Sequence, residues 1–575
     1  MSGIIKHIFF LLFVGIFSFS ASAEIKQYAD YSGGSGFEIK ELTAGQVDNL
    51  TVLGKVWGFV KYHHPALDDS APDVFNIDYE LFELFAKVVD ASQEERNKVL
   101  VDWIRYLGNF KAVPDEYSKV LNTSIPAANT DFTWLADTEE LGKDLSGLLI
   151  ELQFAERTDN RYATIIGKQP KDYFSGEEVY EDVTNYDYGY GLLSLFRFWN
   201  VIEYYYPYKQ LIGRDWDDVL REYIVRFSQP DGGEIRLEEA RMTTEIHDSH
   251  TGLNCDFLWG EYRLPVSFVF AQGKLVVLFN HILSTDGIIN TGVEELRQGD
   301  EVISVNGQGA DHFVELAIRY HSDSNGSRML RTAAFIAACV DAPSATVRVK
   351  RGNETLDIQC TASKELPPYS SDTFHYDIGP YNYGLINEEI GYIYFGEFNP
   401  WLAGRVLRDF ENTKGVIIDL RRYPNYFLAP FITDFLYPEP TECALFQKPY
   451  DNSPGYFYEE ETILGGGAKN TYKGNIIILV NEYTQSSGEY MAMLAQVYNK
   501  CVTVGSQTAG TNGNSGSLKL PNGREMWLTL HGAYYADGSG MQRTGVRIDH
   551  YVHPTIEGIA AGRDELLDYA LNLLK

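Results

Sequence analysis

The sequence predicts an α/β protein built from several domains, and three observations lead to this fold class. The chain has 575 residues, more than a single hydrophobic core usually serves. Its N-terminal third is dominated by apolar residues at helical spacing. Its C-terminal part alternates short β-branched runs with helical segments, which is typical of a sheet covered by helices on both faces.

Residues 1–23 are predicted to be a secretory signal sequence. Lys6 is the only charged residue, an apolar run follows from Ile8 to Phe19, and the small residues Ala21-Ser22-Ala23 precede Glu24. An uncleaved membrane anchor is the alternative, but the run is short for a span of about 20 residues. We therefore expect a secreted protein of the periplasm or cell envelope, with no stable membrane span after cleavage.

Residues 24–190 are predicted to form a mainly helical domain, and residues 191–262 a further helical segment. The segments Leu53–Pro65 and Leu195–Pro207 resemble each other, and aligning their prolines pairs Trp57 with Trp199. Each is followed by another helical pattern. The sequence thus predicts two related helical hairpins.

A polar turn, D-S-H-T, follows the helical pattern that ends near Ile246. It contains Ser249 and His250. A lone histidine in a loop is more often structural or exposed than functional, so the pattern alone assigns it no role.

Residues 263–362 are predicted to form a small domain of short strands and turns. The segment Arg297–Gln308 has a Gly-Asp pair, a strand and an Asn-Gly turn, and it resembles the PDZ domains of secreted proteases. Such domains bind extended peptide ends by adding a strand to a sheet edge. The loop that usually grips a peptide carboxylate is not recognisable, so no peptide-binding residue is assigned.

Residues 375–575 are predicted to form a separate domain organised around a strand, a turn and a helix. Asn475–Val480 is a buried-strand pattern, and a helix follows from about Glu489. This order places Ser486 and Ser487 at the mouth of a helix, where free N–H groups stabilise developing negative charge. Such a serine can be a nucleophile. The alternative is a serine that only caps the helix, with Glu489 completing a capping box.

The surroundings of this element carry a family resemblance. The strand patterns Ile390–Phe395 and Gly415–Leu420 precede it, and the glycine turn V-G-S-Q-T-A-G follows it. From about Asn387 onward the chain resembles the catalytic domain of the tail-specific (C-terminal processing) serine proteases. The resemblance implies a ClpP/crotonase-like spiral, with Ser486 as nucleophile because it precedes the acidic Glu489 by three positions. Ser487 would supply one oxyanion N–H.

The usual Ser–Lys pair of that family is excluded, because Thr511 stands where the family has its lysine. The branch similar to the tricorn core protease uses a histidine directly after a serine, and Ser249-His250 matches it. His250 is therefore the implied general base. The second oxyanion donor would be the N–H of Tyr423 or Asn425, since Pro424 between them has none.

The residue that orients the histidine stays open at this stage. In the tricorn-like enzymes a glutamate has this role, and Gln542 occupies the comparable place. Asp537 and Asp549 are the nearby alternatives.

Composition narrows the function further. A net charge of −32 makes nucleic-acid binding improbable. The five cysteines show neither metal-ligand nor disulfide spacing, and no metal or organic cofactor is implied. We expect a secreted serine-type endopeptidase, a hydrolase, acting on polypeptides or C-terminal tails. The alternatives are a catalytically inactive peptide-binding envelope protein of the same fold and a glycan-associated protein. No paired carboxylates support glycosidase chemistry.

Overall fold

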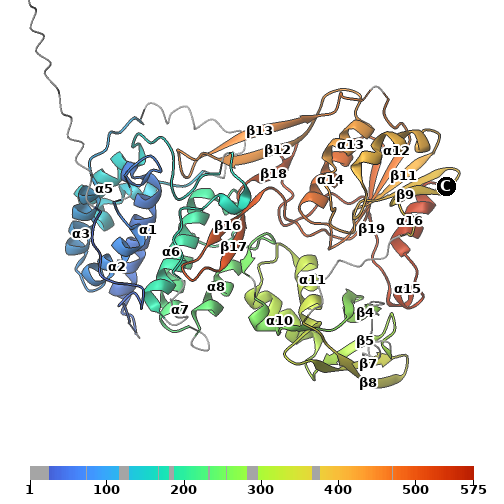
Figure 1. Cartoon of the computed structure of the whole chain (residues 1–575), viewed down its shortest axis with the longest axis horizontal. Helices are drawn as coiled ribbons and strands as arrows, with labels where there is room; N and C mark the ends of the chain where they lie inside the picture. Colours follow the sequence, from blue (N-terminus) through green and yellow to red (C-terminus); the bar gives the residue numbers. More distant parts are fainter. Residues whose placement is uncertain are drawn as a thin grey trace, which may run out of the picture.

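The computed structural model describes residues 25–39, 41–72, 74–114, 129–165, 167–180, 187–230, 234–253, 255–280, 295–364, 376–468 and 470–575. The predicted signal sequence, residues 1–23, lies outside the described residues. In Figure 1 a helical domain at one end faces an α/β domain at the other, with a smaller middle domain below.

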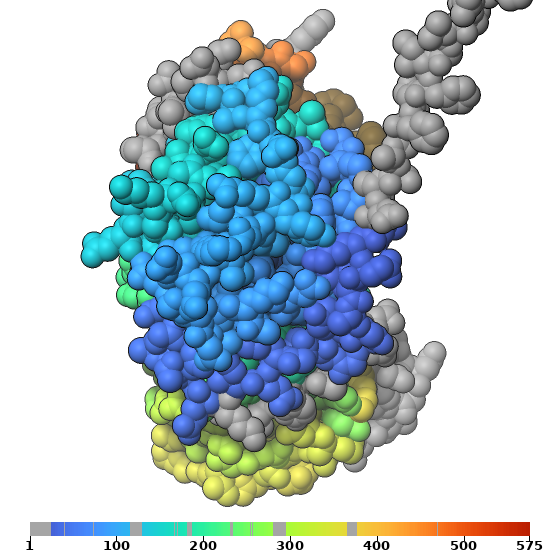
Figure 2. All heavy atoms as spheres, turned by 90° about the vertical axis from the view of Figure 1, so that its left-hand side faces the viewer, coloured from blue at the N-terminus to red at the C-terminus, as the bar shows by residue number. Residues whose placement is uncertain are grey.

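The helical domain contains seven α-helices of eight residues or more within its described part: α1 Ala44–His63, α2 Ile77–Val88, α3 Gln93–Leu107, α5 Thr138–Gln153, α6 Tyr188–Tyr205, α7 Trp216–Ser228 and α8 Ile235–Thr244. Several begin at a side-chain cap. Thr43 and Ser92 form capping boxes with Gln46 and Glu95. The earlier of these helices, in blue to cyan, make up most of the face of the molecule seen in Figure 2.

The two predicted hairpins are confirmed and share a detail that their sequences do not reveal. The Trp57 indole on α1 donates to the carbonyl of Ile77, the first residue of α2, at 2.9 Å. The Trp199 indole on α6 donates to the carbonyl of Trp216, the first residue of α7, at 2.7 Å. Each tryptophan thus fixes the start of the helix that follows its own.

One hydrophobic core runs through the whole helical domain and takes in strands from the far end of the chain. Leu518 and Leu528 belong to it, together with Met526 and Leu530. They lie on or beside β16 (Ser515–Lys519) and β17 (Glu525–Thr529), which pair antiparallel. The short β1 (Gly252–Leu253) completes this sheet on the other edge of β17. The predicted boundary between residues 190 and 191 therefore falls inside a continuous core.

The middle domain is a five-stranded sheet of order β3-β4-β5-β7-β8 with two helices. Its elements are β3 Val266–Ala271, β4 Lys274–Asn280, β5 Glu301–Val305, α10 Ala310–Tyr320, α11 Gly326–Ala337, β7 Ser344–Arg351 and β8 Glu354–Thr361, with α9 Asp256–Trp259, β2 Tyr262–Arg263 and β6 Cys339–Val340 at its border. Val269 and Val276 pack against Ile559 of α15 (Ile556–Ala560), which belongs to the C-terminal domain. The PDZ-like character of this domain stays a prediction.

The C-terminal domain has a six-stranded sheet of order β19-β15-β14-β11-β10-β9, in which β9 alone is antiparallel to its neighbour. The strands are β9 Tyr383–Asn387, β10 Ile390–Tyr394, β11 Gly415–Asp419, β14 Asn475–Val480, β15 Cys501–Gly505 and β19 His550–Tyr551. Helices α12 (Ala403–Phe410), α13 (Ala429–Leu436) and α14 (Ser487–Gln496) pack on one face, and α16 (Glu565–Leu573) on the other. The predicted α/β multidomain fold is confirmed.

A second, three-stranded sheet spans from the C-terminal domain to the helical domain, as Figure 1 shows. Its order is β13-β12-β18, with β12 Thr441–Pro449, β13 Phe457–Leu464 and β18 Gly532–Tyr535. Within the described ranges, no helix combines the length and the apolar character required to span a bilayer.

Candidate functional site

Ser486 lies between strand β14 and helix α14, as the pattern predicts. It is the residue before α14, yet its backbone has φ 51° and ψ −111°. A residue that only caps a helix has extended backbone angles, and a positive φ strains any residue with a Cβ. Strained serines between a strand and a helix are a known arrangement for holding a nucleophile.

Glu489 anchors this strained turn. Its carboxylate accepts hydrogen bonds from the N–H of Ser486 (3.1 Å), Gly510 (2.7 Å) and Thr511 (3.1 Å), and from the Thr508 hydroxyl (2.5 Å). Burial raises the pKa of Glu489 to about 7, although these four donors favour the charged form. Glu489 therefore braces the turn and makes no contact with the pocket in front of Ser486.

The D-S-H-T turn lies against the Ser486 turn. Ser249 exchanges hydrogen bonds with Ser324, N–H to Oγ in both directions at 2.8 Å. The Ser249 carbonyl accepts from the Gln485 side chain at 3.3 Å. Residues adjacent to His250 and to Ser486 are thus in contact, although 236 positions separate them in sequence. Ser249 positions the turn.

His250 is held by a residue that sequence reasoning missed. Its Nδ1 lies 2.9 Å from the hydroxyl oxygen of Thr529, at the end of β17. The pairing of β1 with β17, which sets Gly252 opposite Trp527, brings the two together. Nε2 has no hydrogen-bond partner among the described residues. Burial lowers the pKa of His250 below its usual 6.5, Arg328 adds to this, and Asp248 opposes it.

Thr511, which stands where the family has its lysine, joins the two turns. Its carbonyl accepts from the Ser486 N–H at 3.0 Å. Its hydroxyl donates to the Asp248 carboxylate at 2.6 Å. A residue that cannot be the base thus connects the serine turn to the histidine turn.

None of the three residues considered for orienting the histidine bonds to it. Asp537 pairs with Ser539 and Arg547, and Ser539 above all lowers the pKa of Asp537 to about 2. Asp549 accepts from the Thr503 N–H at 2.8 Å. Gln542 is buried, and within the described structure neither polar atom of its side chain is hydrogen-bonded. The sequence gives no signal for Thr529, which lies 279 positions from His250.

Two backbone N–H groups remain as candidates for binding the oxyanion. Ser487 is the first residue of α14, and its N–H has no partner in the described part of the chain. The N–H of Asn425 donates to the Gly396 carbonyl at 3.2 Å, so it is already occupied. The N–H of Tyr423 is not bonded to any described residue, which leaves it as the second candidate.

A pocket of about 500 Å³ opens in front of Ser486 and the two candidate oxyanion donors. Ser486 and Ser487 line it together with Tyr423 and Asn425, and its remaining walls come from Pro424, Tyr426, Phe427, Phe446, Tyr490, Asn512, Gly513 and Asn514. Tyr423 and Phe427 are exposed at 50% and 65%. Aromatic walls around a serine suit an apolar side chain of a bound chain. Among the described residues, no group of three or more His, Cys, Asp or Glu side chains is arranged to hold a metal ion.

Comparison with known proteins agrees with this geometry. Residues 389–552 match the model of peptidase family S41. Two structures of mature CPAF, one of them complexed with lactacystin, each cover 67% of this chain and 98% of their own, at 14% identity and a TM-score of 0.53. The photosystem II D1 C-terminal processing protease covers 66% of this chain and 98% of its own, at 17% identity and a TM-score of 0.39.

No curated protein matches the chain. The likeness to CPAF shows a shared fold over the length of that protein, and the family match covers the strand, turn and helix around Ser486. Residues 389–552 therefore form a domain of the peptidase family S41 type, and the protein is a serine-type peptidase.

Proposed function

We propose that the protein is a secreted endopeptidase in which Ser486 is the nucleophile and His250 replaces the usual lysine as general base. The observation that carries this proposal is the backbone of Ser486, at φ 51° and ψ −111°. A capping serine has no need of such a conformation. A nucleophile does, because the strain presents its Oγ to the pocket while its neighbour's N–H faces the same space.

The side chains and N–H groups around Ser486 account for each proton in the reaction. With Nδ1 donating to Thr529, the lone pair of His250 is on Nε2 and takes the Ser486 proton as Oγ attacks the peptide carbonyl carbon. The carbonyl oxygen becomes an oxyanion facing the N–H groups of Ser487 and Tyr423. The imidazolium then protonates the leaving amine as the C–N bond breaks. Water repeats the sequence on the acyl-enzyme and regenerates Ser486.

The substrate in this proposal is a polypeptide or a C-terminal tail with an apolar residue near the cleaved bond. The aromatic walls of the pocket support this preference. The PDZ-like reading of the middle domain and export directed by residues 1–23 belong to the same proposal. N-terminal sequencing of the exported protein should begin at Glu24, and a retained Met1 would contradict export with cleavage.

The inactive peptide-binding alternative has one observation in its favour. The orienting partner of His250 is a hydroxyl, Thr529, and a hydroxyl stabilises an imidazolium less than a carboxylate does. Catalysis has to be measured to decide between the two.

The deciding experiment is digestion of a peptide library by the wild type and three variants. Ser486→Ala and His250→Ala should each lose activity by several orders of magnitude, because residues of one catalytic unit fail together. Ser487→Ala is the matched control, since it keeps the backbone N–H and should retain most activity. Equal turnover by the wild type and Ser486→Ala would exclude this nucleophile. Absence of turnover in all four would favour the binding protein.

A further inference from the structure

The buried carboxylate of Asp248 has no part in the steps above, although it belongs to the histidine turn. Asp248 is fully buried. Its Oδ1 accepts from the His250 N–H at 3.0 Å and from the Thr511 hydroxyl at 2.6 Å. Its Oδ2 makes no well-formed hydrogen bond among the described residues, and the Tyr206 hydroxyl is the side-chain donor that interacts with this carboxylate. Burying a carboxylate with an oxygen that is not fully hydrogen-bonded is costly.

Asp248 does not touch the imidazole ring in the way a triad carboxylate does. The ring's Nδ1 is bonded to Thr529, and Asp248 bonds to the backbone of His250. Its negative charge nevertheless acts on the ring, because Asp248 is two positions before His250 and is bonded to the His250 N–H. In a water-poor interior a nearby negative charge stabilises a positively charged ring even without a hydrogen bond to it.

The other charged groups around the turn do not cancel this effect. Arg328 of α11 opposes Asp248 at the ring, because its positive charge lowers the pKa of His250. Arg543 also acts on Asp248 from the segment after β18, and it donates to the Ile246 carbonyl at 3.2 Å. Tyr206 lies beside the carboxylate, and burial first and Asp248 second raise the pKa of its hydroxyl. The ring is thus subject to the opposing charges of one carboxylate and one guanidinium.

We propose that Asp248 is a positioning residue that stabilises the imidazolium of His250 by its charge, in place of a carboxylate bonded to the ring. The inference rests on the proposed function, in which His250 becomes an imidazolium during each turnover. It explains how the enzyme can use a hydroxyl, Thr529, as the partner of Nδ1. It also gives Thr511 a role, because its hydroxyl holds Asp248 in place.

The test is the rate at which a fluorophosphonate probe labels Ser486, measured between pH 4.5 and 9. Labelling forms the Oγ–P bond, releases fluoride and passes the serine proton to His250, so it needs no knowledge of the substrate. In Asp248→Asn the acid midpoint should move down by about one pH unit, and the plateau rate should fall about tenfold. Asparagine keeps the acceptor at Oδ1, so the turn keeps its hydrogen bonds.

Two variants should move the midpoint the other way. Arg328→Gln removes the opposing positive charge, and Thr511→Val leaves the Asp248 charge less neutralised. The acid midpoints of both variants should rise. They test whether charge at the ring sets the midpoint even if Asp248→Asn fails to fold. A lower plateau with unchanged midpoints in all soluble variants would reduce Asp248 to a brace of the turn. A wild type that labels no faster than Ser486→Ala would instead refute the proposed function.

Discussion

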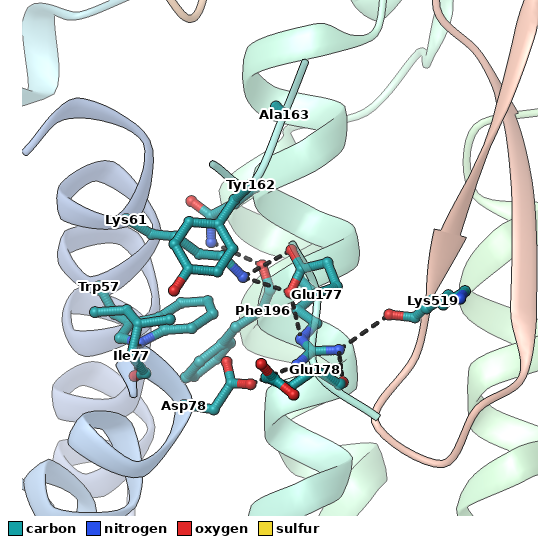
Figure 3. Close-up of polar contacts among 12 residues, drawn as sticks. Trp57, Lys61, Ile77, Asp78, Tyr162, Ala163, Glu177, Glu178, Phe196 and Lys519 are labelled. Carbon is teal, nitrogen blue, oxygen red and sulfur yellow. Dashed lines mark hydrogen bonds and ion pairs between the residues drawn. The ribbon is translucent and has the colours of Figure 1, made fainter. Parts of the chain in front are cut away.

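Two buried polar clusters of this protein contain similar groups and are built in opposite ways. In the helical domain, Lys61 binds Glu177 at 2.7 Å, and Arg197 binds Glu177 at 2.9 Å and Asp78 at 2.5 Å. Figure 3 shows Lys61 of α1, Asp78 of α2 and Glu177 of the segment before α6 converging. Arg197 belongs to α6. Two cations face two carboxylates, and all four side chains are at most 2% exposed.

The cluster around Ser486 and His250 lacks this balance. Its carboxylate Asp248 has an unpaired oxygen, Nε2 of His250 is without a partner among the described residues, and Ser486 has a strained backbone. The first cluster balances its charges and holds segments together, although Asp78 Oδ1 also has no hydrogen-bond partner in the described structure. The second leaves donors, acceptors and strain in place, which is expected where a substrate supplies the missing partners. The two clusters therefore differ in charge balance and in backbone strain, whereas an unpaired carboxylate oxygen is common to both.

The largest effect that would test this comparison is on stability. Arg197→Met leaves Asp78 and Glu177 buried with a single cation, so the free energy of unfolding should fall by about 3–5 kcal/mol. Any protein that remains folded should keep its activity, because Arg197 bonds to none of the residues around Ser486 and reaches β16 only through the Lys519 carbonyl. Chemical denaturation measures the first quantity and probe labelling of Ser486 the second.

The control is Arg348→Met, which removes an exposed ion pair with Asp357 and should leave stability near that of the wild type. If the two arginine variants were equally stable, the helical-domain cluster would not be the structural element described here.

The next effect is on activity. Thr529→Val removes the partner of His250 Nδ1, and kcat/KM should fall by about 10–100-fold because a hydrogen bond to a group that becomes charged is lost. Stability should change little. Thr529→Ser keeps the hydroxyl and should recover most of the activity, and a Thr529→Val enzyme with wild-type kcat/KM would show that the ring is oriented otherwise.

A smaller effect is expected at the nucleophile, where a substitution should raise the free energy of unfolding or leave it unchanged. Ser486→Gly removes backbone strain of about 1–3 kcal/mol, against about 0.5–1 kcal/mol for the added freedom of glycine in the unfolded chain. The inactive variant should therefore be as stable as the wild type or more so. Ser487→Gly, one residue further and inside α14, should be less stable than the wild type. Thermal unfolding of the two compares them directly, and a destabilised Ser486→Gly would argue against strain at Ser486.

The smallest expected effect is a shift in pH dependence. Burial lowers the pKa of His250, so its ring stays neutral to lower pH than a free histidine. Activity should be lost as pH falls through that lowered pKa, and the acid midpoint of kcat/KM should lie below 6.5. A pH–rate profile with its acid midpoint at or above 6.5 would contradict the burial of the ring.

The sequence predicts secondary structure that depends on neighbouring residues, but it does not predict contacts between residues far apart in the chain. The strand, turn and helix around Ser486 depend on neighbouring residues, and the structure confirms them. Thr529 and Asp248 could not be assigned, because their partners lie 279 and 263 positions away and no periodic pattern marks such a pairing. The conformation of Ser486 also escaped prediction, because a capping box and a strained turn share the same residue pattern.

His63 shows the same limit in the helical domain. It is the last residue of α1, where the helix dipole favours a positive charge. Burial, however, lowers its pKa well below 6.5, so the ring is neutral. Position follows from the pattern, whereas charge follows from the surroundings that folding creates.

The insertion of β16 and β17 into the core of the helical domain has a consequence for the newborn chain. The helical domain is made first, yet Leu518, Leu528 and Thr529 complete it and are made near the end of synthesis. Until then the histidine turn has neither its sheet partner nor its hydroxyl. A ribosome-bound chain that stops before residue 515 should therefore be unable to react at Ser486 even though Ser486 is already present. The order of synthesis thereby delays proteolytic activity until β16 and β17 have completed the core of the helical domain.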